Sequence, residues 1–283
     1  MNSKMVAKDT EHLKIIIETA IGMKGVQCDL NHVDVSNITD MNDLFLDSTF
    51  NGNISDWDVS NVTTMENIFR DSKFNGDISR WNVSKVESMF AMFKGTKFNQ
   101  NISEWNISSL KVMDVMFSHS EFNGDISKWN TSNVTSMNSM FWNSKFNSDI
   151  SNWNVEKVTQ MSGMFCDSKF DGDISKWDVS NVIMMDQMFE YAEFNRDIGN
   201  WNVSKVTDMR TMFNNSKFQY DLTSWTPYKA NTIKMFDNCP APVPYWADYS
   251  RKEKKKIIEV YQLTNELNQK AENKNATTKR IKL

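Results

Sequence analysis

The sequence has few of the residues on which catalysis, metal binding and disulfide frameworks depend. Its 283 residues include only three histidines, three cysteines and four prolines. The histidines lie far apart, so they cannot compose a His-based metal cluster or a catalytic triad, and no phosphate-binding loop or paired-carboxylate motif stands out. These shortages predict a protein that is not an enzyme and that uses no metal, no cofactor and no small-molecule substrate.

The cysteines also argue against a disulfide framework. Cys28, Cys166 and Cys239 are odd in number and do not share the spacing of the repeat described below. Such a pattern favours a reducing, intracellular environment.

Export signals and long apolar runs are missing as well. The first twelve residues contain Asp9 and Glu11, and the apolar stretch that follows is short and charged, unlike a secretion signal. No transmembrane segment, lipid-anchor cysteine motif or wall-sorting motif is visible. We therefore expect a cytoplasmic protein with no membrane span, for which display on a surface would require another route.

Aromatic residues, in contrast, are frequent and regularly spaced. Eight of the ten tryptophans, two columns of phenylalanine and one of methionine recur every 24 residues, with no insertion between residues 41 and 225. Only Trp142 and Trp246 lie outside the tryptophan series. A fixed period of roughly 20–50 residues is typical of a solenoid or another repeat array. The tryptophans that we expect in the structural core are Trp57, Trp81, Trp105, Trp129, Trp153, Trp177, Trp201 and Trp225.

Each repeat predicts a strand, a turn and a short helix. In residues 54–69, "ISDWDVSNVTTMENIF", alternating apolar residues indicate a strand around residues 56–60, and Ser60 or Asn61 can cap a helix. Val62, Met65 and Phe69 then share one face of a two-turn helix. One unit buries too few apolar side chains to offset the entropy of ordering it, so neighbouring units must stack. The predicted fold is therefore an α/β solenoid, a leucine-rich-repeat-like, right-handed stack of eight 24-residue strand–turn–helix repeats with helical caps at both ends.

Four segments are expected along the chain. Residues 1–27 are predicted to form an N-terminal capping helix, residues 28–239 the repeats, residues 240–272 a C-terminal cap with a basic helix, and residues 273–283 a flexible tail. The basic helix should run from about 249 to 271. The N-terminal helix should cover the open end of the core with one apolar stripe: Leu13, Ile16, Ile17, Ala20 and Ile21.

The repeat resembles that of a known family. The pattern "FNGDISxWDVSNVTxMxxMF" looks like the repeat of the BspA-type, leucine-rich-repeat-like surface-protein family over residues 28–239. The opening "CDLNHVDVSNITDMNDLF" looks like that family's degenerate first repeat. The resemblance implies an interaction scaffold, often at cell surfaces, with no catalytic residues.

Two repeated polar motifs have both a structural and a functional interpretation. The many Asn-x-Ser/Thr triplets could accept glycans, but the repeat also needs Asn and Ser to cap its turns. A column of aspartates could suggest stacked calcium sites, but calcium needs more converging carboxylates than this column supplies. We favour capping in both cases. The aspartate column comprises Asp77, Asp125, Asp149, Asp173, Asp197 and Asp221.

Charge is distributed unevenly along the chain. Residues 251–283 contain ten Lys/Arg and four Asp/Glu, a net charge of +6. The other 250 residues therefore have a net charge of −10, which brings the whole chain to −4. The basic segment is either a solvated tail or a contact for phosphate or an acidic partner. The residues of this candidate basic contact are Arg251, Lys252, Lys254, Lys255 and Lys256.

Two columns beside the tryptophans point away from the predicted core. One is nearly invariant and predicts a ladder of side-chain amides from repeat to repeat; it comprises Asp58, Asn82, Asn106, Asn130, Asn154, Asp178 and Asn202. The other varies in charge and is a candidate recognition surface, with Arg80, Glu104, Lys128 and Lys176 as its candidate partner-binding residues.

Three large apolar residues break the rule of the repeat. Phe90, Val115 and Trp142 stand in consecutive repeats at positions that are usually polar, and they could form one exposed patch. This patch favours a non-enzymatic interaction scaffold that presents an elongated surface to a protein partner, and nucleic acid is not expected as a partner. The alternative is a structural component that self-associates into a particle or a surface array.

Overall fold

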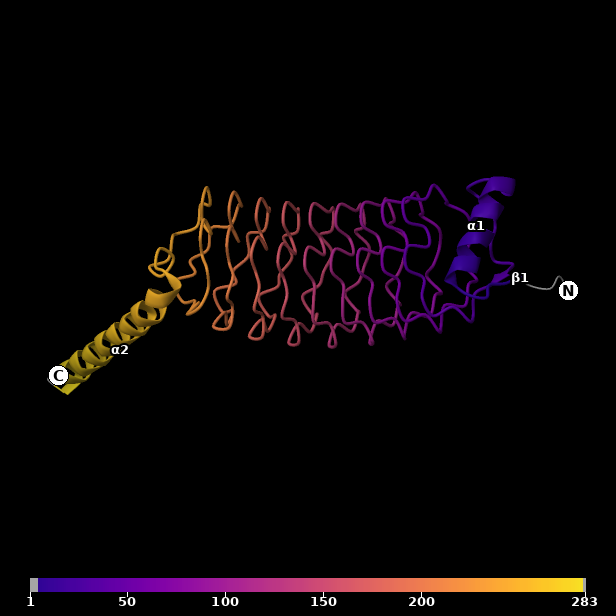
Figure 1. Ribbon diagram of the computed structural model, residues 1–283. Coiled ribbons are helices and arrows are strands. Elements are labelled where there is room, and N and C mark those ends of the chain that lie inside the picture. Colours follow the sequence, from indigo (N-terminus) through magenta and orange to yellow (C-terminus); the bar gives the residue numbers. More distant parts are fainter. Residues whose placement is uncertain (1–4, 282–283) are drawn as a thin grey trace.

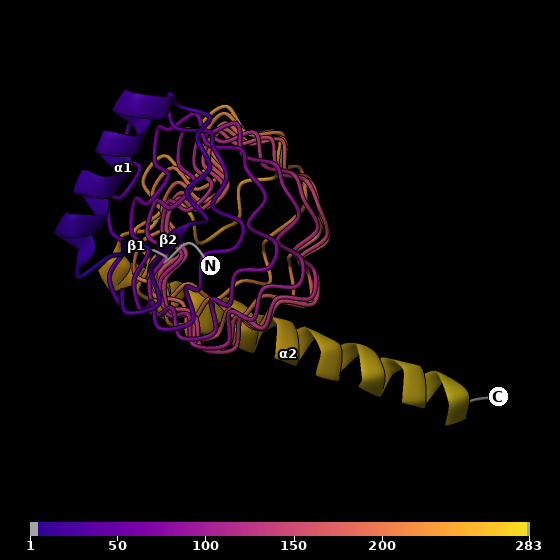
Figure 2. The ribbon, with the colours of Figure 1, turned by 90° about the vertical axis from the view of Figure 1, so that its right-hand side faces the viewer.

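The computed structural model describes residues 5–281, with side chains for residues 5–273. Between residues 28 and 239 the chain winds into a row of coils along one axis, which we call the coil stack (Figure 1). Helix α1 (Thr10–Lys24) lies at one end of the coil stack, and helix α2 (Arg251–Ile281) projects from the other end. Seen along the axis, successive coils follow nearly the same outline (Figure 2).

Neighbouring coils are joined by parallel backbone bridges at the same point of every turn. A continuous series of bridges starts between Asp40 and Thr64 and ends between Asp208 and Asn231. Each step of this series spans 24 residues except the last, which spans 23. The shorter last step accounts for Phe236, which comes one residue early in its column.

The strand expected around residues 56–60 and the helix expected over residues 62–69 are both wrong. Residues 35–250, all of them described, contain no helix and no strand beyond the isolated bridges. A chain of turns replaces the helix, because Asn67 and Asp71 have positive φ angles of 53° and 54°. A residue in the left-handed conformation at these points directs backbone N–H groups along the axis of the stack. Hydrogen bonds to the next coil thus replace the i to i−4 hydrogen bonds of a helix.

The hydrogen bonds of this turn chain are regular. The N–H groups of Met65, Asn67, Phe69 and Asp71 donate to carbonyl oxygens of the following coil at 2.7–3.1 Å. The same pattern recurs in later coils, for example from Met161 to the carbonyl oxygen of Met184 at 3.0 Å. The inward spacing of apolar residues fits a helix and this turn chain equally well, and for that reason the sequence pattern alone favoured a helix.

The core consists of stacked aromatic columns. All eight tryptophans of the series are buried, with 1–4% of their surface exposed. Successive rings lie nearly parallel, as between Trp129 and Trp153, whose centroids are 6.4 Å apart at an interplanar angle of 6°. Each indole Nε1 donates to a carbonyl oxygen of the preceding coil, 27 residues earlier, at 3.0–3.2 Å. One side chain therefore fills the core and also ties two coils together.

A side-chain ladder runs along the stack, but in a different column from the one expected. The nearly invariant column makes local turns instead, as where Asn82 Oδ1 accepts from the N–H of Ser84. All seven side chains of this column accept from the backbone N–H two positions ahead. The inter-coil ladder links side-chain oxygens to backbone N–H groups of the next coil at 2.7–3.2 Å. It runs through Asn51, Asn75, Asn99, Asn123, Asn147, Asp171, Asn195 and Gln219.

The first coil is covered by the N-terminal segment. Strand β1 (Met5–Val6) pairs in parallel with strand β2 (Val33–Asp34). Helix α1 follows, with Asp9 as its N-cap accepting from the N–H of His12. Its buried residues Leu13, Ile16 and Ile17 close the core, and Ala20 and Ile21 pack at the edge.

Helix α2 caps the last coil with its first three turns, the third of which carries Tyr261, stacked on Tyr245 with ring centroids 4.0 Å apart. Ile258 of α2 and Trp246, which lies just before the helix, are fully buried, whereas the described side chains after Ile258 are exposed. The helix also runs to Ile281, past the expected end near residue 271. The last two residues of the expected flexible tail, 282 and 283, lie outside the described residues. Neither described helix is long and apolar enough to cross a membrane.

Candidate interaction surfaces

Trp142 is the most exposed of the described tryptophans. Its side chain is 43% exposed, whereas the tryptophans of the series are 1–4% exposed. The indole packs edge-on against His119 of the preceding coil, with ring centroids 5.3 Å apart. The backbone supports this pairing, because the N–H of His119 donates to the carbonyl oxygen of Trp142 at 2.7 Å. A large aromatic ring is thus held at the surface in a fixed orientation.

A groove of about 480 Å³ runs across the coils beside Trp142. His119 and Tyr191 line it as aromatic residues, and Glu121, Lys145 and Lys169 are among its charged residues. Tyr191 is 56% exposed. The groove combines exposed rings with a polar rim, which is the anatomy of many protein-binding surfaces.

His119 and Tyr191 are not among the residues predicted to bind a partner, although the sequence carries a signal for both. Each repeat has two residues with positive φ angles, such as Asn67 and Asp71. His119 and Tyr191 occupy the second of these two positions in their repeats, with φ angles of 57°. The other repeats fill this position with residues that tolerate such a backbone: Asp47, Asp71, Gly95, Asn143, Asp167, Asn215 and Asn238. A histidine and a tyrosine among Asp, Asn and Gly mark a departure from the rule of the repeat, as Trp142 does.

Phe90 and Val115 contribute less surface than the expected patch requires. Both are half-buried, and of the three patch residues only Trp142 is among the exposed large apolar side chains. The contact that fixes Trp142 is with His119, so the surface around Trp142 extends toward the groove.

Val115 has an unusual backbone for a β-branched residue. Its φ angle is 62°, and its N–H donates to the carbonyl oxygen of Asn138 at 2.8 Å. A left-handed conformation costs an L-residue about 1–2 kcal/mol, and asparagine, which stands at the sister position Asn67, tolerates it better. We expect Val115→Asn to keep or raise the free energy of unfolding, by up to about 1 kcal/mol, despite the loss of apolar surface. Chemical denaturation measures this change. Val115→Thr keeps the β-branch and should give no gain, and a clear loss of stability in Val115→Asn would contradict the prediction.

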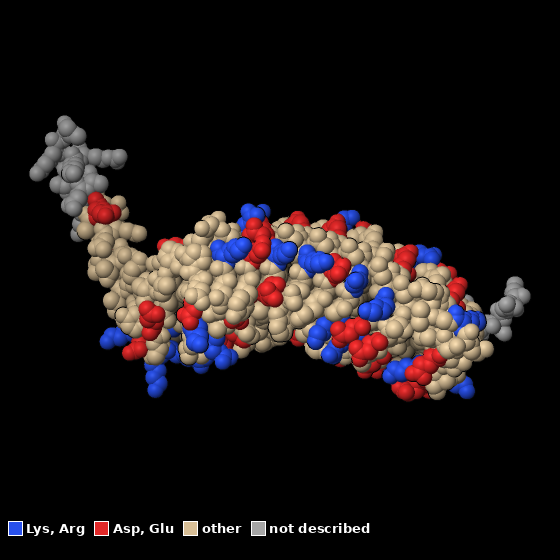
Figure 3. Space-filling view, turned by 90° about the horizontal axis from the view of Figure 1, so that it is seen from above, with Lys and Arg blue, Asp and Glu red and all other residues tan. Residues whose placement is uncertain are grey.

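The variable charged column pairs within itself. Arg80 Nη2 lies 2.6 Å from Asp56 Oδ1, and Lys128 Nζ lies 3.2 Å from Glu104 Oε1, each across one coil step. Lys176 is exposed on a later coil. Exposed pairs of this kind contribute about 0–1 kcal/mol each to stability. On the face shown in Figure 3, basic and acidic residues accordingly lie interleaved along the stack.

The aspartate column caps turns, as the sequence predicts. Asp77, Asp125, Asp149 and Asp173 each accept, through Oδ1, from the backbone N–H of the serine two residues ahead at 2.8–2.9 Å. These backbone hydrogen bonds lower the pKa of all four carboxyl groups from the ordinary value. Among the described residues, no group of three or more His, Cys, Asp or Glu is arranged to hold a metal ion.

The cysteines are free thiols. Cys28 and Cys166 are buried, and burial, with Glu190 and Asp167 nearby, raises the pKa of the Cys166 thiol to about 12. At neutral pH this group is a protonated thiol, which is a poor nucleophile.

The basic cluster does not form one surface. Arg251, Lys252, Lys255 and Lys256 are exposed, whereas Lys254 is buried against the last coil. Arg251 Nη2 donates to the carbonyl oxygen of Thr207 at 3.0 Å. The cluster therefore divides into residues that meet the coil stack and residues that face solvent.

Comparison with known proteins places the repeat region in one family. Residues 16–121, 101–193 and 144–249 each match the family described as "Mycoplasma protein of unknown function, DUF285". A search of the curated proteins found no match, and a search of the solved structures found none either. The three matched segments overlap and together span residues 16–249, which include every bridged coil of the stack. The chain belongs to the DUF285 repeat family.

Proposed function

We propose that the protein is a non-enzymatic scaffold that presents the long surface of its coil stack to a protein partner. The observation that carries this proposal is Trp142, an exposed aromatic ring fixed beside a groove in a chain that buries the tryptophans of its repeat series. Exposed tryptophans at the centre of a polar rim often supply much of the binding free energy of an interface.

We also propose that the coil stack is a right-handed solenoid of the leucine-rich-repeat kind and that the family is related to the BspA-type surface proteins. The 24-residue period, the parallel bridge that recurs from coil to coil and the amide ladder support the first part. The repeat pattern of the sequence supports the second part. Such an architecture presents side chains from many coils in regular columns, which suits the recognition of an extended surface.

The main test replaces Trp142 by lysine, the residue that its sister position Lys94 carries. Since Trp142 is partly exposed, we expect Trp142→Lys to leave the melting temperature nearly unchanged. Loss of a central aromatic contact of about 2 kcal/mol should weaken binding roughly 30-fold. The measurement is a pull-down with the tagged chain, followed by a titration with the partner that is captured.

Two further variants sharpen this test. Tyr220→Lys removes another exposed aromatic ring from a different column and should leave the affinity unchanged. The triple variant Phe90→Glu, Val115→Asn and Trp142→Lys should bind no more weakly than Trp142→Lys alone if the surface extends toward His119. A Trp142→Lys protein that binds normally would overturn the proposed surface.

A second function, assembly into a particle or array, is favoured by one feature of α2. Val260, Leu263 and Leu267 are 52%, 59% and 66% exposed and recur along the helix at a spacing of three and four residues. Light scattering on the purified chain distinguishes the two functions. A monomer that forms one discrete heterologous complex supports the scaffold, and large homogeneous species of the chain alone support assembly.

A further inference from the structure

A cavity of about 770 Å³ lies where the last coil meets α2. One wall comes from residues 230–234 of the last coil and the other from residues 247–252 and Lys254 at the start of α2. Its charged lining residues are Lys234, Arg251, Lys252, Lys254 and a single acid, Asp248. Four basic groups face one carboxylate, although the chain as a whole carries a net charge of −4.

Lys254 is the least expected of these groups because it is only 1% exposed. Its Nζ donates to Thr232 Oγ1 at 2.7 Å and to the carbonyl oxygen of Tyr249 at 2.6 Å. Both acceptors are uncharged, and Lys254 takes part in none of the ion pairs between described side chains. Burial lowers its pKa, with Asp248 acting in the opposite direction. A buried ammonium without a paired anion is costly, and an anion in the cavity would offset that cost.

Backbone donors meet at the same cavity. The N–H groups of Arg251 and Lys252 open α2 and have no acceptor within the helix. Lys234 occupies a left-handed position with a φ angle of 57°, where the N–H of the sister residue Thr211 donates to the next coil at 3.0 Å. No bridged coil follows Asn231 in the described chain, so the N–H of Lys234 has no such acceptor. Successive N–H groups at left-handed positions and at helix N-termini are favourable sites for anions.

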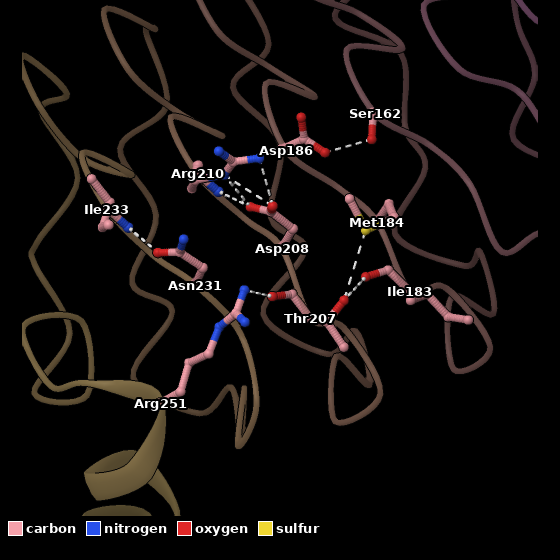
Figure 4. A network of polar contacts seen from close by, with 10 residues as sticks. All are labelled: Ser162, Ile183, Met184, Asp186, Thr207, Asp208, Arg210, Asn231, Ile233 and Arg251. Carbon is pink, nitrogen blue, oxygen red and sulfur yellow. Dashed lines mark hydrogen bonds and ion pairs between the residues drawn. The ribbon is translucent and has the colours of Figure 1, made fainter.

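Arg251 is held in place from the opposite side. It reaches from the start of α2 to the coil carrying Thr207, where one guanidinium nitrogen is bound to the backbone (Figure 4). The remaining donors of the guanidinium group stay available, because the group has five N–H donors in all. An arginine anchored by a single bond is oriented before any ligand arrives.

We propose that this cavity is a binding site for a phosphate-bearing small molecule, with the phosphoryl group held by Arg251, Lys252 and the backbone N–H groups of the two walls, and with the buried charge of Lys254 behind them. Several charged donors and several N–H groups exceed what a carboxylate can use, and they match a dianion with three terminal oxygens. The volume of the cavity leaves room for an organic group beside the phosphate. This site is separate from the groove beside Trp142, which shares no lining residue with it.

The test is a titration of the full chain with inorganic phosphate at constant ionic strength, followed by nuclear magnetic resonance. We expect saturable shifts in the amide signals of Lys234, Arg251 and Lys252. Acetate, titrated in the same way, should give shifts at least tenfold weaker in apparent affinity. Equal responses to the two anions would assign the site to carboxylates and overturn the phosphoryl proposal.

Matched variants test whether the cavity itself is responsible. Lys234→Gln with Lys252→Gln removes two lining charges and should weaken phosphate binding tenfold or more. Lys255→Gln with Lys256→Gln removes the same charge from the same region, outside the cavity, and should change the affinity less than twofold. All four lysines are exposed, so both variants should melt like the parent chain in chloride. No saturable shift in the parent chain, or equal weakening in the two variants, would overturn the proposal.

Discussion

Replacement of Trp153 by alanine is expected to lower the free energy of unfolding by about 3–5 kcal/mol, the usual range for a buried aromatic side chain. Trp153 is 3% exposed and stacks between Trp129 at 6.4 Å and Trp177 at 6.5 Å. Its Nε1 donates to the carbonyl oxygen of Ile126 at 3.1 Å. The substitution therefore opens a cavity between coils and removes the inter-coil hydrogen bond to this carbonyl oxygen, which keeps only the local bond from the N–H of Trp129 at 3.2 Å.

The measurement is thermal or chemical denaturation beside a matched variant. For a chain of this size the expected loss corresponds to a fall of roughly 6–20 °C in melting temperature. Trp142→Ala removes the same side chain from the surface of the stack and should change the melting temperature by no more than a few degrees. Equal melting temperatures for Trp153→Ala and the parent chain would show that the tryptophan column is not part of the core.

Deletion of residues 147–170, one full period, is expected to give a shorter protein that still folds cooperatively. The deletion joins Phe146 to Asp171, and Phe146 is equivalent to Phe170, with stacked rings 6.2 Å apart. Asp171 then takes the place of Asn147 in the side-chain ladder, where both side chains act as acceptors. At about 0.05–0.15 kcal/mol per residue, the loss of one coil should cost roughly 1–4 kcal/mol.

Deletion of half a period is the control for this experiment. Removing residues 147–158 joins Phe146 to Thr159 and shifts every later residue by half a coil. Aromatic residues of the following coils would then meet polar positions of the preceding coils, and the inter-coil hydrogen bonds would lose their partners. We expect this variant to lose its cooperative transition, whereas the full-period deletion keeps it. Tryptophan fluorescence during thermal unfolding reports both outcomes. If the two deletions unfold alike, the repeat is not the unit of folding.

The period and the identity of the buried columns could be predicted from the sequence because they depend on spacing alone. Residues that recur every 24 positions must occupy equivalent places in equivalent coils, and eight tryptophans cannot all remain in water. The secondary structure of each repeat could not be predicted in this way. Val62, Met65 and Phe69 point inward in a helix and also in a chain of turns. The choice between them depends on Asn67 and Asp71, whose left-handed conformation no single repeat reveals.

The interaction surfaces, too, combine residues that the sequence singles out with contacts that form only between stacked coils. Trp142 could be singled out from the sequence because it departs from the repeat, but its partner His119 comes from the preceding coil and becomes adjacent only when the coils stack. The sequence predicts that Arg80 and Lys128 contact a partner, yet each is paired with an acid 24 residues earlier. Lys254 belonged to a run of basic residues, and nothing in that run distinguishes the one lysine that is buried.

The 24-residue coil, the residues that fill its core and the position of the N-terminal cap can thus be predicted from the amino-acid sequence. These follow from local spacing and from the need to remove aromatic side chains from water. The conformation of the turns, the column that forms the ladder and the groups that converge on the cavity at Lys254 depend instead on how the coils pack against one another. Those features depend on hydrogen bonds and charges between residues at least 22 positions apart in the sequence. Such residues interact only after neighbouring coils have come into contact.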